Sequence, residues 1–474
     1  MRGLRFKSAV GVALASAVLL APLAATAGPV VRIGPTTQIS SCAGPNAEPV
    51  SAVDGRYVYV AWIGCASTAT KIAVATSSDG GATFAAPVFI SPSPSSWDPT
   101  LAVGPDHHVY LAYMVGRVDC VFTSCSSVAV TSPYVAVSTN HGASFSAAQP
   151  LYQPVAPTTS NFADRPFIAI APDGTIAMSY DFGPGIAPYS LLCAKGQSCS
   201  FAAGQYNAVV QISHDGGATW SNQIPIDPRY PIGGEWSAAL VAEPNDTFDA
   251  LMWDHLTDPT TYAMSSGPIT FSHSGVDGLT WSTPSVVSAA RIPLSTWWVD
   301  GSIGIDAGGT LYAAWDAQGA GGDTPYLAYS TNDGQSWSTP IAMAPGSNAS
   351  HLAAIVGGAP GTAYVALQTG DAVAYRTKVT GFSVSTLRLA PWKSVSPVLY
   401  DPSVWPGDTV GLSYRGASRV SAHLFVNWGG ALMGSSSSEI WGSGVNVILR
   451  KSRRPRSPRP GESRVHAHVG RGHS

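Results

Sequence analysis

The sequence predicts an all-β protein built from repeated four-stranded sheets, and two observations carry this prediction. Only 11% of the 474 residues are charged, whereas 49 are Gly, 37 Pro, 14 Trp and 18 Tyr. Such a composition is typical of short strands joined by tight turns. In addition, one eight-residue pattern recurs along the chain between segments of alternating apolar residues. Recurrence of this kind indicates a repeat architecture.

The eight-residue pattern reads Ser-x-Asp/Asn-x-Gly-x-Thr/Ser-aromatic, with full copies beginning at 77, 138, 213 and 330 and a degraded copy at 274. The acid or amide accepts hydrogen bonds from backbone amides in a tight turn, and the Gly adopts a positive φ. The aromatic residue packs as an anchor. Each copy is therefore a predicted hairpin turn with a structural role for its acid or amide: Asp79, Asn140, Asp215, Asn332 and, displaced by one residue in the degraded copy, Asp277.

A second pattern precedes every turn: a polar start, an apolar strand, a short turn and a strand rich in aromatic residues. The successive starts are Glu48, Asp98, Asp164, Glu235 and Asp300, and a sixth copy without the turn pattern begins near His351. Their spacing suits one four-stranded blade per copy with loops of variable length. The sequence thus predicts six blades in one ring.

These turns resemble the Asp-box, or BNR, repeats of the sialidase superfamily over roughly residues 30–390. The resemblance implies a six-bladed β-propeller of four-stranded antiparallel sheets. It also implies that the box joins the third and fourth strands of a blade, on the face away from the active site. The reaction that it implies is exo-α-sialidase hydrolysis. In this reaction three arginines bind the substrate carboxylate, a Tyr assisted by a Glu is the nucleophile, and an Asp is the acid/base.

The two ends of the chain differ from this repeated part. The first 27 residues combine basic residues, an apolar run and a small-residue end at Ala25-Thr26-Ala27, which predicts a secretory signal and a secreted protein. Residues 28–392 are assigned to the propeller. Residues 450–474 carry eight Lys or Arg and one Glu, and are expected to be either a solvated disordered tail or an arm that binds a polyanion.

Residues 393–449 leave two structures open. They weakly resemble a small β-sandwich of the carbohydrate-binding kind, in which Trp405, Trp428 and Trp441 would stack on sugar rings. Alternatively, the same segment is a seventh blade closed by the N-terminal strand Val-Val-Arg-Ile-Gly beginning at Val30.

The six cysteines are expected to form disulfides, since an even number in an exported chain without a CxxC pair favours bridges over a metal site. They are Cys42, Cys65, Cys120, Cys125, Cys193 and Cys199. Local pairing would join 120 to 125 and 193 to 199 and leave 42 with 65, although spacing does not fix the connectivity.

Charge and hydropathy restrict the partners. The 28 acidic residues outnumber the 25 basic ones, of which eight lie in the tail, so the acidic body should repel nucleic acid. After the signal no apolar run approaches the roughly 20 residues of a membrane span. We therefore expect a monomer whose partner is a glycan or polysaccharide.

In a propeller of this kind the first strand of each blade begins at the channel mouth. Glu48, Asp98 and Asp300 are accordingly candidate substrate-binding residues, with Asp164 as a candidate acid and Glu235 as the most plausible Glu to assist a nucleophile. Two long loops, residues 115–132 and 182–206, are expected over the same opening and each contains a predicted disulfide. Loops of this kind commonly carry binding sites.

The arginines needed to hold a substrate carboxylate are Arg165, Arg229 and Arg291 in this reading, because a guanidinium grips a carboxylate through two parallel hydrogen bonds. The family's Arg-Ile-Pro signature departs from its usual place. The chain has Arg32-Ile33-Gly34-Pro35 near the first blade and a literal Arg-Ile-Pro only at 291–293, before the fifth. This departure weakens the sialidase assignment, and the Tyr nucleophile is not identified.

The ring of acids admits other interpretations. The ring could bind a hard cation such as Ca²⁺ or a neutral, hydroxyl-rich sugar. Alternatively, the acids only cap the first strands through hydrogen bonds to backbone amides. The eleven histidines show no metal-ligand spacing, so no metal site, zinc included, and no required cofactor are predicted. The leading function is a secreted sialidase-like exo-glycosidase. The alternatives are a non-catalytic propeller that binds glycan or protein, and a hydrolase or lyase of a neutral polysaccharide.

Overall fold

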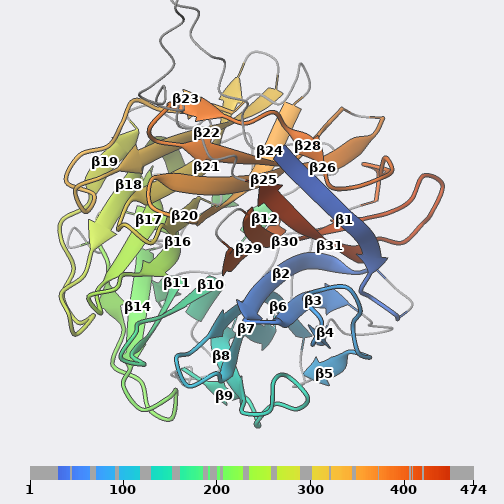
Figure 1. Cartoon of the computed structure of the whole chain (residues 1–474). Helices are drawn as coiled ribbons and strands as arrows, with labels where there is room; N and C mark the ends of the chain where they lie inside the picture. Colours follow the sequence, from blue (N-terminus) through green and yellow to red (C-terminus); the bar gives the residue numbers. More distant parts are fainter. Residues whose placement is uncertain are drawn as a thin grey trace, which may run out of the picture. The chain divides into compact units, whose positions relative to one another are not determined.

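The computed structural model contains seven antiparallel blades of a β-propeller (Figure 1), of which blades 2 and 3 are joined by one parallel pairing, Asn161 with Val130. Every regular element in the part of the chain that it describes is a strand. The described residues are 30–42, 45–64, 71–90, 95–117, 130–151, 161–184, 190–192, 200–202, 207–227, 234–257, 264–288, 301–319, 322–343, 349–371, 373–404, 407, 409–418 and 421–448.

Each of the first six blades is formed by consecutive strands, numbered from the innermost outward. Blade 1 is β2 (Ala47–Asp54), β3 (Tyr57–Gly64), β4 (Lys71–Ser77) and β5 (Val88–Ile90). Blade 2 is β6 (Ser95–Val103), β7 (Val109–Arg117), β8 (Val130–Ser138) and β9 (Gln149–Pro150). Blade 3 is β10 (Asn161–Ile170), β11 (Ile176–Pro184), β14 (Asn207–Ser213) and β15 (Ile224–Pro225), with a hairpin of β12 (Ser190–Leu192) and β13 (Ser200–Ala202) in its β11–β14 connection.

The next three blades repeat this order. Blade 4 is β16 (Gly234–Ala242), β17 (Phe248–Thr257), β18 (Met264–His273) and β19 (Ser285–Ser288). Blade 5 is β20 (Ser302–Ile305), β21 (Leu311–Gly319), β22 (Gly322–Ser330) and β23 (Ile341–Ala342). Blade 6 is β24 (Ala349–Gly357), β25 (Thr362–Gly370) and β26 (Tyr375–Ser383), whose outer edge pairs with both β27 (Arg388–Leu389) and β28 (Lys393–Ser394).

The seventh blade corrects the expected number of six. It consists of β29 (Val410–Ala417), β30 (Ser421–Gly430), β31 (Glu439–Ile448) and, as its outermost strand, β1 (Val30–Gln38). β1 pairs antiparallel with β31, with Val31 opposite Val447. Of the two structures left open for residues 393–449, the chain adopts the blade closed by the N-terminal strand. Trp428 is fully buried there, so it is not available to stack on a sugar.

The ring closes through its innermost strands and through apolar layers between blades. Neighbouring innermost strands contact one another in order around the axis, and β29 contacts both β24 and β2. One hydrophobic cluster fills each of the seven interfaces between adjacent blades. Burial of these layers, which is favourable in proportion to the apolar area removed from water, holds the blades together.

The Asp-box turns combine the expected hydrogen bonds with an apolar anchor. In the first copy the Asp79 carboxylate accepts hydrogen bonds from the Ser77 hydroxyl (2.7 Å) and from the Thr83 amide (2.9 Å) and hydroxyl (2.6 Å). These bonds favour the charged form and lower the pKa of Asp79 to about 2. The box aromatic packs on the preceding blade: Phe84 lies 5.8 Å from Phe425, ring centre to ring centre.

The copies at Asn140, Asp215 and Asn332 accept the same two bonds from the box serine hydroxyl and the backbone amide, whereas the copy in blade 4 does not. In the two asparagine copies the side-chain amide donates to the following serine hydroxyl. Val276 occupies its acid position and is 65% exposed. Asp277 accepts one bond, from the Leu279 amide, and the Ser274 hydroxyl donates to the Gly275 carbonyl instead. Blade 4 therefore lacks the carboxylate or amide that ties the other turns.

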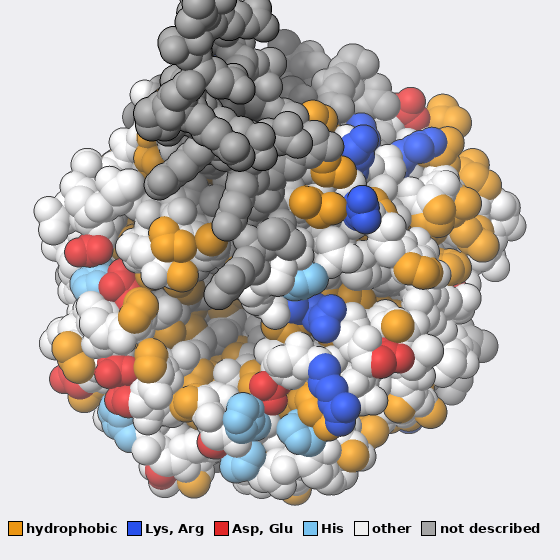
Figure 2. All heavy atoms as spheres, in the orientation of Figure 1, with side chains coloured by type: hydrophobic (Ala, Val, Ile, Leu, Met, Phe, Trp, Pro, Cys, Tyr) orange, Lys and Arg blue, Asp and Glu red, His pale blue; other side chains and the backbone are white. Residues whose placement is uncertain are grey.

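Figure 2 shows that charged side chains are unevenly spread over the face turned to the viewer. Lysine and arginine lie mainly in the right half, from the region of β26 and β28 down toward blade 1, while most acidic and histidine side chains lie toward the left and the bottom. No helix that could cross a membrane occurs among the described residues.

Candidate functional site

The innermost strands of blades 1 to 3 share an irregularity at the channel mouth. Their register shifts between Ala47 and Val50, between Trp97 and Thr100, and between Asp164 and Phe167. The first residue inside each of these bulges has a positive φ: 53° at Glu48, 47° at Asp98 and 51° at Arg165. This conformation costs a non-glycine residue about 1–2 kcal/mol, so three copies of it at one opening are unusual.

A proline follows each of these three residues, which fits the geometry because a bulge leaves one residue unpaired and proline has no amide to pair. Gly407 stands in the corresponding place before β29, with φ 91°, and a Cβ added there would overlap the backbone of Glu48. The bulge therefore aims one side chain per blade toward the channel mouth. It also corrects the predicted frame: Arg165, not Asp164, occupies the position of Glu48 and Asp98.

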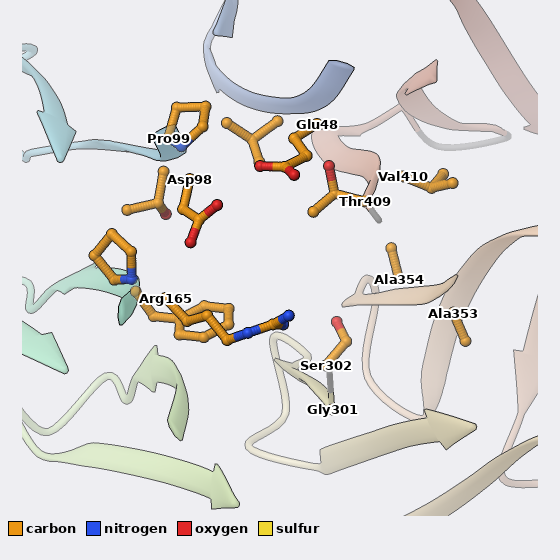
Figure 3. A pocket seen from close by; sticks show the side chains of 14 residues that line it. Glu48, Asp98, Pro99, Arg165, Gly301, Ser302, Ala353, Ala354, Thr409 and Val410 are labelled. Atoms are coloured by element: carbon orange, nitrogen blue, oxygen red, sulfur yellow. The ribbon is translucent and has the colours of Figure 1, made fainter. Parts of the chain in front are cut away.

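These residues line a pocket of about 180 Å³ at the mouth (Figure 3). Its lining also includes the residues two positions beyond each bulge. In full it is lined by Glu48, Val50, Asp98, Pro99, Thr100, Arg165, Pro166, Phe167, Gly301, Ser302, Ala353, Ala354, Thr409 and Val410. Blades 1, 2, 3, 5, 6 and 7 all contribute, so the pocket exists only in the closed ring.

Three carboxyl groups meet on one side of this pocket. The side chain of Asp98 is hydrogen-bonded to those of Glu48 and Asp164, and Glu48 is only 5% exposed. Burial, followed by the negative charges of Glu48 and Asp164, raises the pKa of Asp98 well above its usual range. The protonated form of Asp98 is therefore favoured over a wider pH range than in an ordinary aspartate. Trp97 fixes the third carboxylate by donating its indole Nε1–H to Asp164 at 3.3 Å.

Arg165 brings the positive charge to the same pocket. It is 8% exposed, and its guanidinium reaches across the cavity toward Ser302, away from the carboxyl groups of Glu48 and Asp98 (Figure 3). A buried guanidinium presents a planar fork of donors suited to carboxylate, sulfate or phosphate. The pocket thus brings a cluster of acids and a buried arginine together.

Several predicted residues lie outside the described part of the chain. These are Arg229, Arg291 and Asp300, together with the side chain of Glu235 in β16. The arginine triad therefore stays a prediction. No tyrosine is among the described residues that line the pocket.

The hydroxyl groups of Thr100, Ser302 and Thr409 were not foreseen. Thr100 and Thr409 follow the positive-φ residue of their blade by two positions, and in the sequence Ser302 likewise follows Asp300 by two. Of the six cysteines only Cys42 is described, and it is disulfide-bonded; the predicted pairing of the others lies outside the described residues.

Comparison with known proteins gives one family match and a set of similar folds. The BNR/Asp-box repeat model matches residues 211–222, the box of blade 3. No curated protein matches the sequence.

Among solved structures, a PL25 ulvan lyase bound to a GlcA–Rha3S saccharide has 14% identity and a TM-score of 0.50, covering 86% of this chain and 95% of that one. A GH93 α-L-arabinofuranosidase of Fusarium graminearum has 13% identity and a TM-score of 0.44, covering 87% and 97%. A sialidase from Streptococcus pneumoniae has 12% identity and a TM-score of 0.43, covering 88% and 70%. The chain is a seven-bladed β-propeller carrying BNR/Asp-box repeats, as the resemblance in its sequence predicted apart from the number of blades.

Proposed function

We propose that this protein is a secreted glycosidase of the sialidase-like, exo-acting kind, which processes glycans in the pocket at the channel mouth. The observation that carries the proposal is Asp98, whose pKa is raised by burial and by two neighbouring carboxylates in a pocket that also contains a buried arginine. The small pocket, of about 180 Å³, favours the terminal sugar of a glycan over a sugar in the middle of a chain. Export agrees with the signal-like N-terminus.

In this mechanism Asp98 donates its proton to the oxygen of the glycosidic bond as that bond breaks. A general acid is most effective when its pKa lies near the working pH, and burial together with the neighbouring carboxylates raises the pKa of Asp98 in that direction. Arg165 would hold the acidic group of the sugar. The negative charge of that group then lies on the side of the pocket opposite to Glu48.

Glu48 and Asp164 do not have the placement of a second catalytic carboxylate. The paired carboxyl groups of ordinary glycosidases are about 5–9.5 Å apart so that a sugar or a water fits between them, whereas these are in hydrogen-bond contact with Asp98. They act by raising the pKa of Asp98. The attacking group would therefore be a tyrosine or a water molecule, as in enzymes that act on sialic acid.

The test is hydrolysis of fluorogenic sialosides, uronosides and neutral aryl glycosides by the purified protein and by Asp98→Asn. We expect release from an acidic glycoside that falls about 10²–10⁴-fold in the variant. Asp106→Asn is the matched control, because Asp106 is an exposed acid in the β6–β7 turn, at the other end of blade 2. Equal loss in both variants, or no release from any glycoside, would reject the enzyme.

A second candidate is a non-catalytic propeller that binds glycan through the same pocket. It is favoured by the lack of tyrosine among the described lining residues and by the small side chains of Ala353 and Ala354, which contribute no reactive group. Glycan-array binding that requires Arg165 but is accompanied by no cleavage would support it. An unsaturated product from a polysaccharide would point to a lyase instead.

A further inference from the structure

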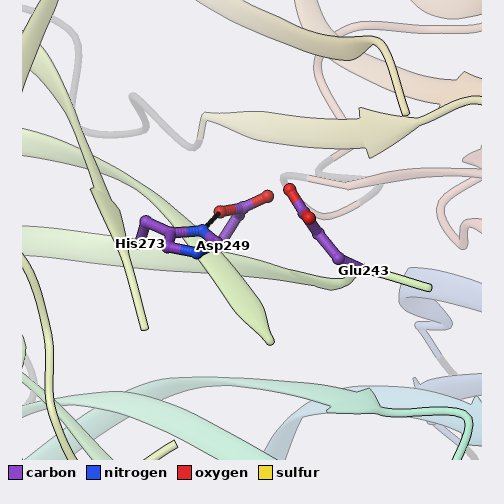
Figure 4. Close-up of side chains that lie close together, drawn as sticks. All are labelled: Glu243, Asp249 and His273. Atoms are coloured by element: carbon purple, nitrogen blue, oxygen red, sulfur yellow. Dashed lines mark hydrogen bonds and ion pairs between the residues drawn. The ribbon is translucent and has the colours of Figure 1, made fainter. Parts of the chain in front are cut away.

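Three side chains of the types that ligate metals meet in blade 4, at the end opposite to the mouth. Glu243 directly follows β16, Asp249 lies at the start of β17, and His273 is the last residue of β18. Their ligand atoms lie within 4.8 Å of one another, and His273 Nδ1 is 2.7 Å from Asp249 Oδ1 (Figure 4). Antiparallel pairing places all three on the face of the Asp-box turns. This cluster is therefore separate from the mouth pocket.

The two carboxylates of the cluster are buried without a donor between them. Glu243 is 6% exposed and Asp249 is fully buried. Glu243 Oε1 and Asp249 Oδ2 accept no hydrogen bond from any described residue, and the two groups face each other (Figure 4). Burial beside Asp249 raises the pKa of Glu243 to about 8. Buried carboxylates in this arrangement require a proton or a cation between them.

The equivalent turn of blade 5 shows how an acid is accommodated when no ion is needed. Asp306 occupies the position of Glu243, since the backbone amide of each donates to the carbonyl of the threonine four residues later, Thr310 and Thr247 respectively. The Asp306 carboxylate is saturated by donors: the Gly308 amide (2.7 Å), the Tyr312 hydroxyl (2.7 Å) and the Gly361 amide (2.6 Å). In blade 4 the place of that tyrosine is taken by Asp249, which cannot donate.

All three positions of the cluster differ from their equivalents in other blades. The position of Asp249 is held by Tyr110, Ala177, Tyr312 and Tyr364 in the blades that share this turn. The position of His273, directly before the box serine, is held by Thr76, Val137, Ile212 and Tyr329. Blade 4 thus gathers three ligand-type residues at once. It is also the blade whose Asp-box lacks its acid.

We propose that Glu243, Asp249 and His273 bind a divalent transition-metal ion, with Zn²⁺ as the best fit, that fastens the turn end of blade 4. One imidazole and two carboxylates form a ligand set that suits Zn²⁺ better than Ca²⁺, which prefers oxygen ligands alone. The ion takes the place of the proton that His273 Nδ1 now shares with Asp249 Oδ1. His273, with 32% of its side chain exposed, provides access from solvent.

The ion would replace what the degraded box has lost. In the other copies the box carboxylate or amide ties the turn after the third strand, whereas here the ion would join the ends of β16, β17 and β18. The exposed Asp333 of blade 5 adds negative charge beside Glu243 and His273, which further favours a cation. Sequence spacing gave no sign of the site, because its ligands are 6 and 24 residues apart on three strands.

The experiment measures Zn²⁺ binding and thermal unfolding of the untagged full chain after treatment with a chelator. We expect one Zn²⁺ at this site and a Tm raised by several degrees at saturating metal, since an ion that binds only the folded state stabilises it. Asp249→Asn should weaken Zn²⁺ binding at least about 100-fold and abolish the Tm shift. His273→Gln should do the same and serves as the second variant if the first fails to fold.

Two controls isolate the site. His108 forms another Asp–His pair, with 2.7 Å between His108 Nδ1 and Asp106 Oδ2. This pair has no third ligand among the described residues. The His108→Gln variant should therefore bind Zn²⁺ as the wild type does. The triple variant of the tail histidines, His466→Ala, His468→Ala and His473→Ala, should retain the Tm shift. Wild-type protein that gains no Tm shift, or variants at 249 and 273 that keep it, would overturn the proposal. Anomalous scattering at the zinc edge would locate the ion directly.

Discussion

The two ends of the blades differ in what is repeated from blade to blade: the side chains at the Asp-box end and the backbone conformation at the mouth. At the Asp-box end the same residues recur and make the same hydrogen bonds, as Asp79 and Asp215 do with their serine and threonine partners. At the mouth the backbone recurs, with a bulge and a positive φ, but the side chain that it presents changes from Glu48 to Asp98 to Arg165.

This difference separates structural residues from functional ones without an alignment. A repeated side chain on a repeated backbone indicates a role in each blade's own stability. A changing side chain on a repeated, strained backbone indicates that the scaffold is retained to aim different chemistry at one point. Blade 4 applies the same distinction at the Asp-box end, where the repeat is broken and three ligand-type residues appear.

After loss of the acid in Asp98→Asn, the largest expected effect comes from removing the positive charge at the mouth. In Arg165→Ala the kcat/KM for an acidic glycoside should fall about 10²–10³-fold, or ~2.7–4 kcal/mol, because a buried donor fork that faces the substrate is lost. Arg165→Lys should recover part of this activity, since it keeps the charge but not the fork. Arg56→Ala is the control at the other end, where Arg56 lies exposed over the Tyr57 ring. Equal activity of the Arg165 and Arg56 variants would contradict the assignment of the mouth.

The next effect lies at the Asp-box end and concerns stability alone. Gly334 has φ 70°, and a Cβ added there would overlap the ring of Phe271. Gly334→Ala should lower the free energy of unfolding by about 2–4 kcal/mol through backbone strain and overpacking. Gly361→Ala has a similar φ of 74° but open space around the new Cβ, so it should cost only about 1–2 kcal/mol. Denaturant unfolding of both variants distinguishes steric overlap from φ strain.

A smaller loss of stability is expected from replacing the buried serine of the box. The Ser77 hydroxyl donates to Asp79 and accepts from the Gly81 amide at 2.8 Å. Ser77→Ala should lower the free energy of unfolding by about 1–2 kcal/mol and leave the activity of the folded protein unchanged. A loss of activity that exceeds the unfolded fraction would show that the box end influences the mouth.

Much of the fold could be predicted from the sequence because its signals are local. The box turns depend on eight consecutive residues, and their recurrence predicts the blades. The seventh blade was not decided, because β1 and β31 are separated by some 400 residues and either closure or a separate domain satisfies the local pattern.

The candidate site was predicted only in part. Glu48, Asp98 and Arg165 were all identified, yet Asp164 was placed in the frame that belongs to Arg165. A one-residue error of this kind follows from the bulge, which breaks the two-residue alternation on which strand frames rely. The blade 4 cluster was missed for a different reason, since its ligands converge only after three strands pair.

The smallest effects are those of pH, and they should have opposite signs at the two ends. Asp79 has a folded-state pKa of about 2, below the value of about 3.9 for an unfolded Asp. Its contribution to stability is therefore present above pH 4 and lost as the pH falls through 2. Asp98 has a raised folded-state pKa, so its contribution is complete below about pH 3.9 and is lost as the pH rises through the folded-state value.

Unfolding free energies measured from pH 2 to pH 8 test both signs. Asp79→Asn should flatten the pH dependence of the unfolding free energy on the acid side. The turn should survive, because Asn140 accepts a bond from the Ser144 amide just as Asp79 does from the Thr83 amide. Asp98→Asn should flatten the decline of the unfolding free energy toward neutral pH and leave its pH dependence on the acid side unchanged. If Asp98→Asn instead alters the acid side, Asp98 is ionised in the folded protein and is not the proton donor at the mouth.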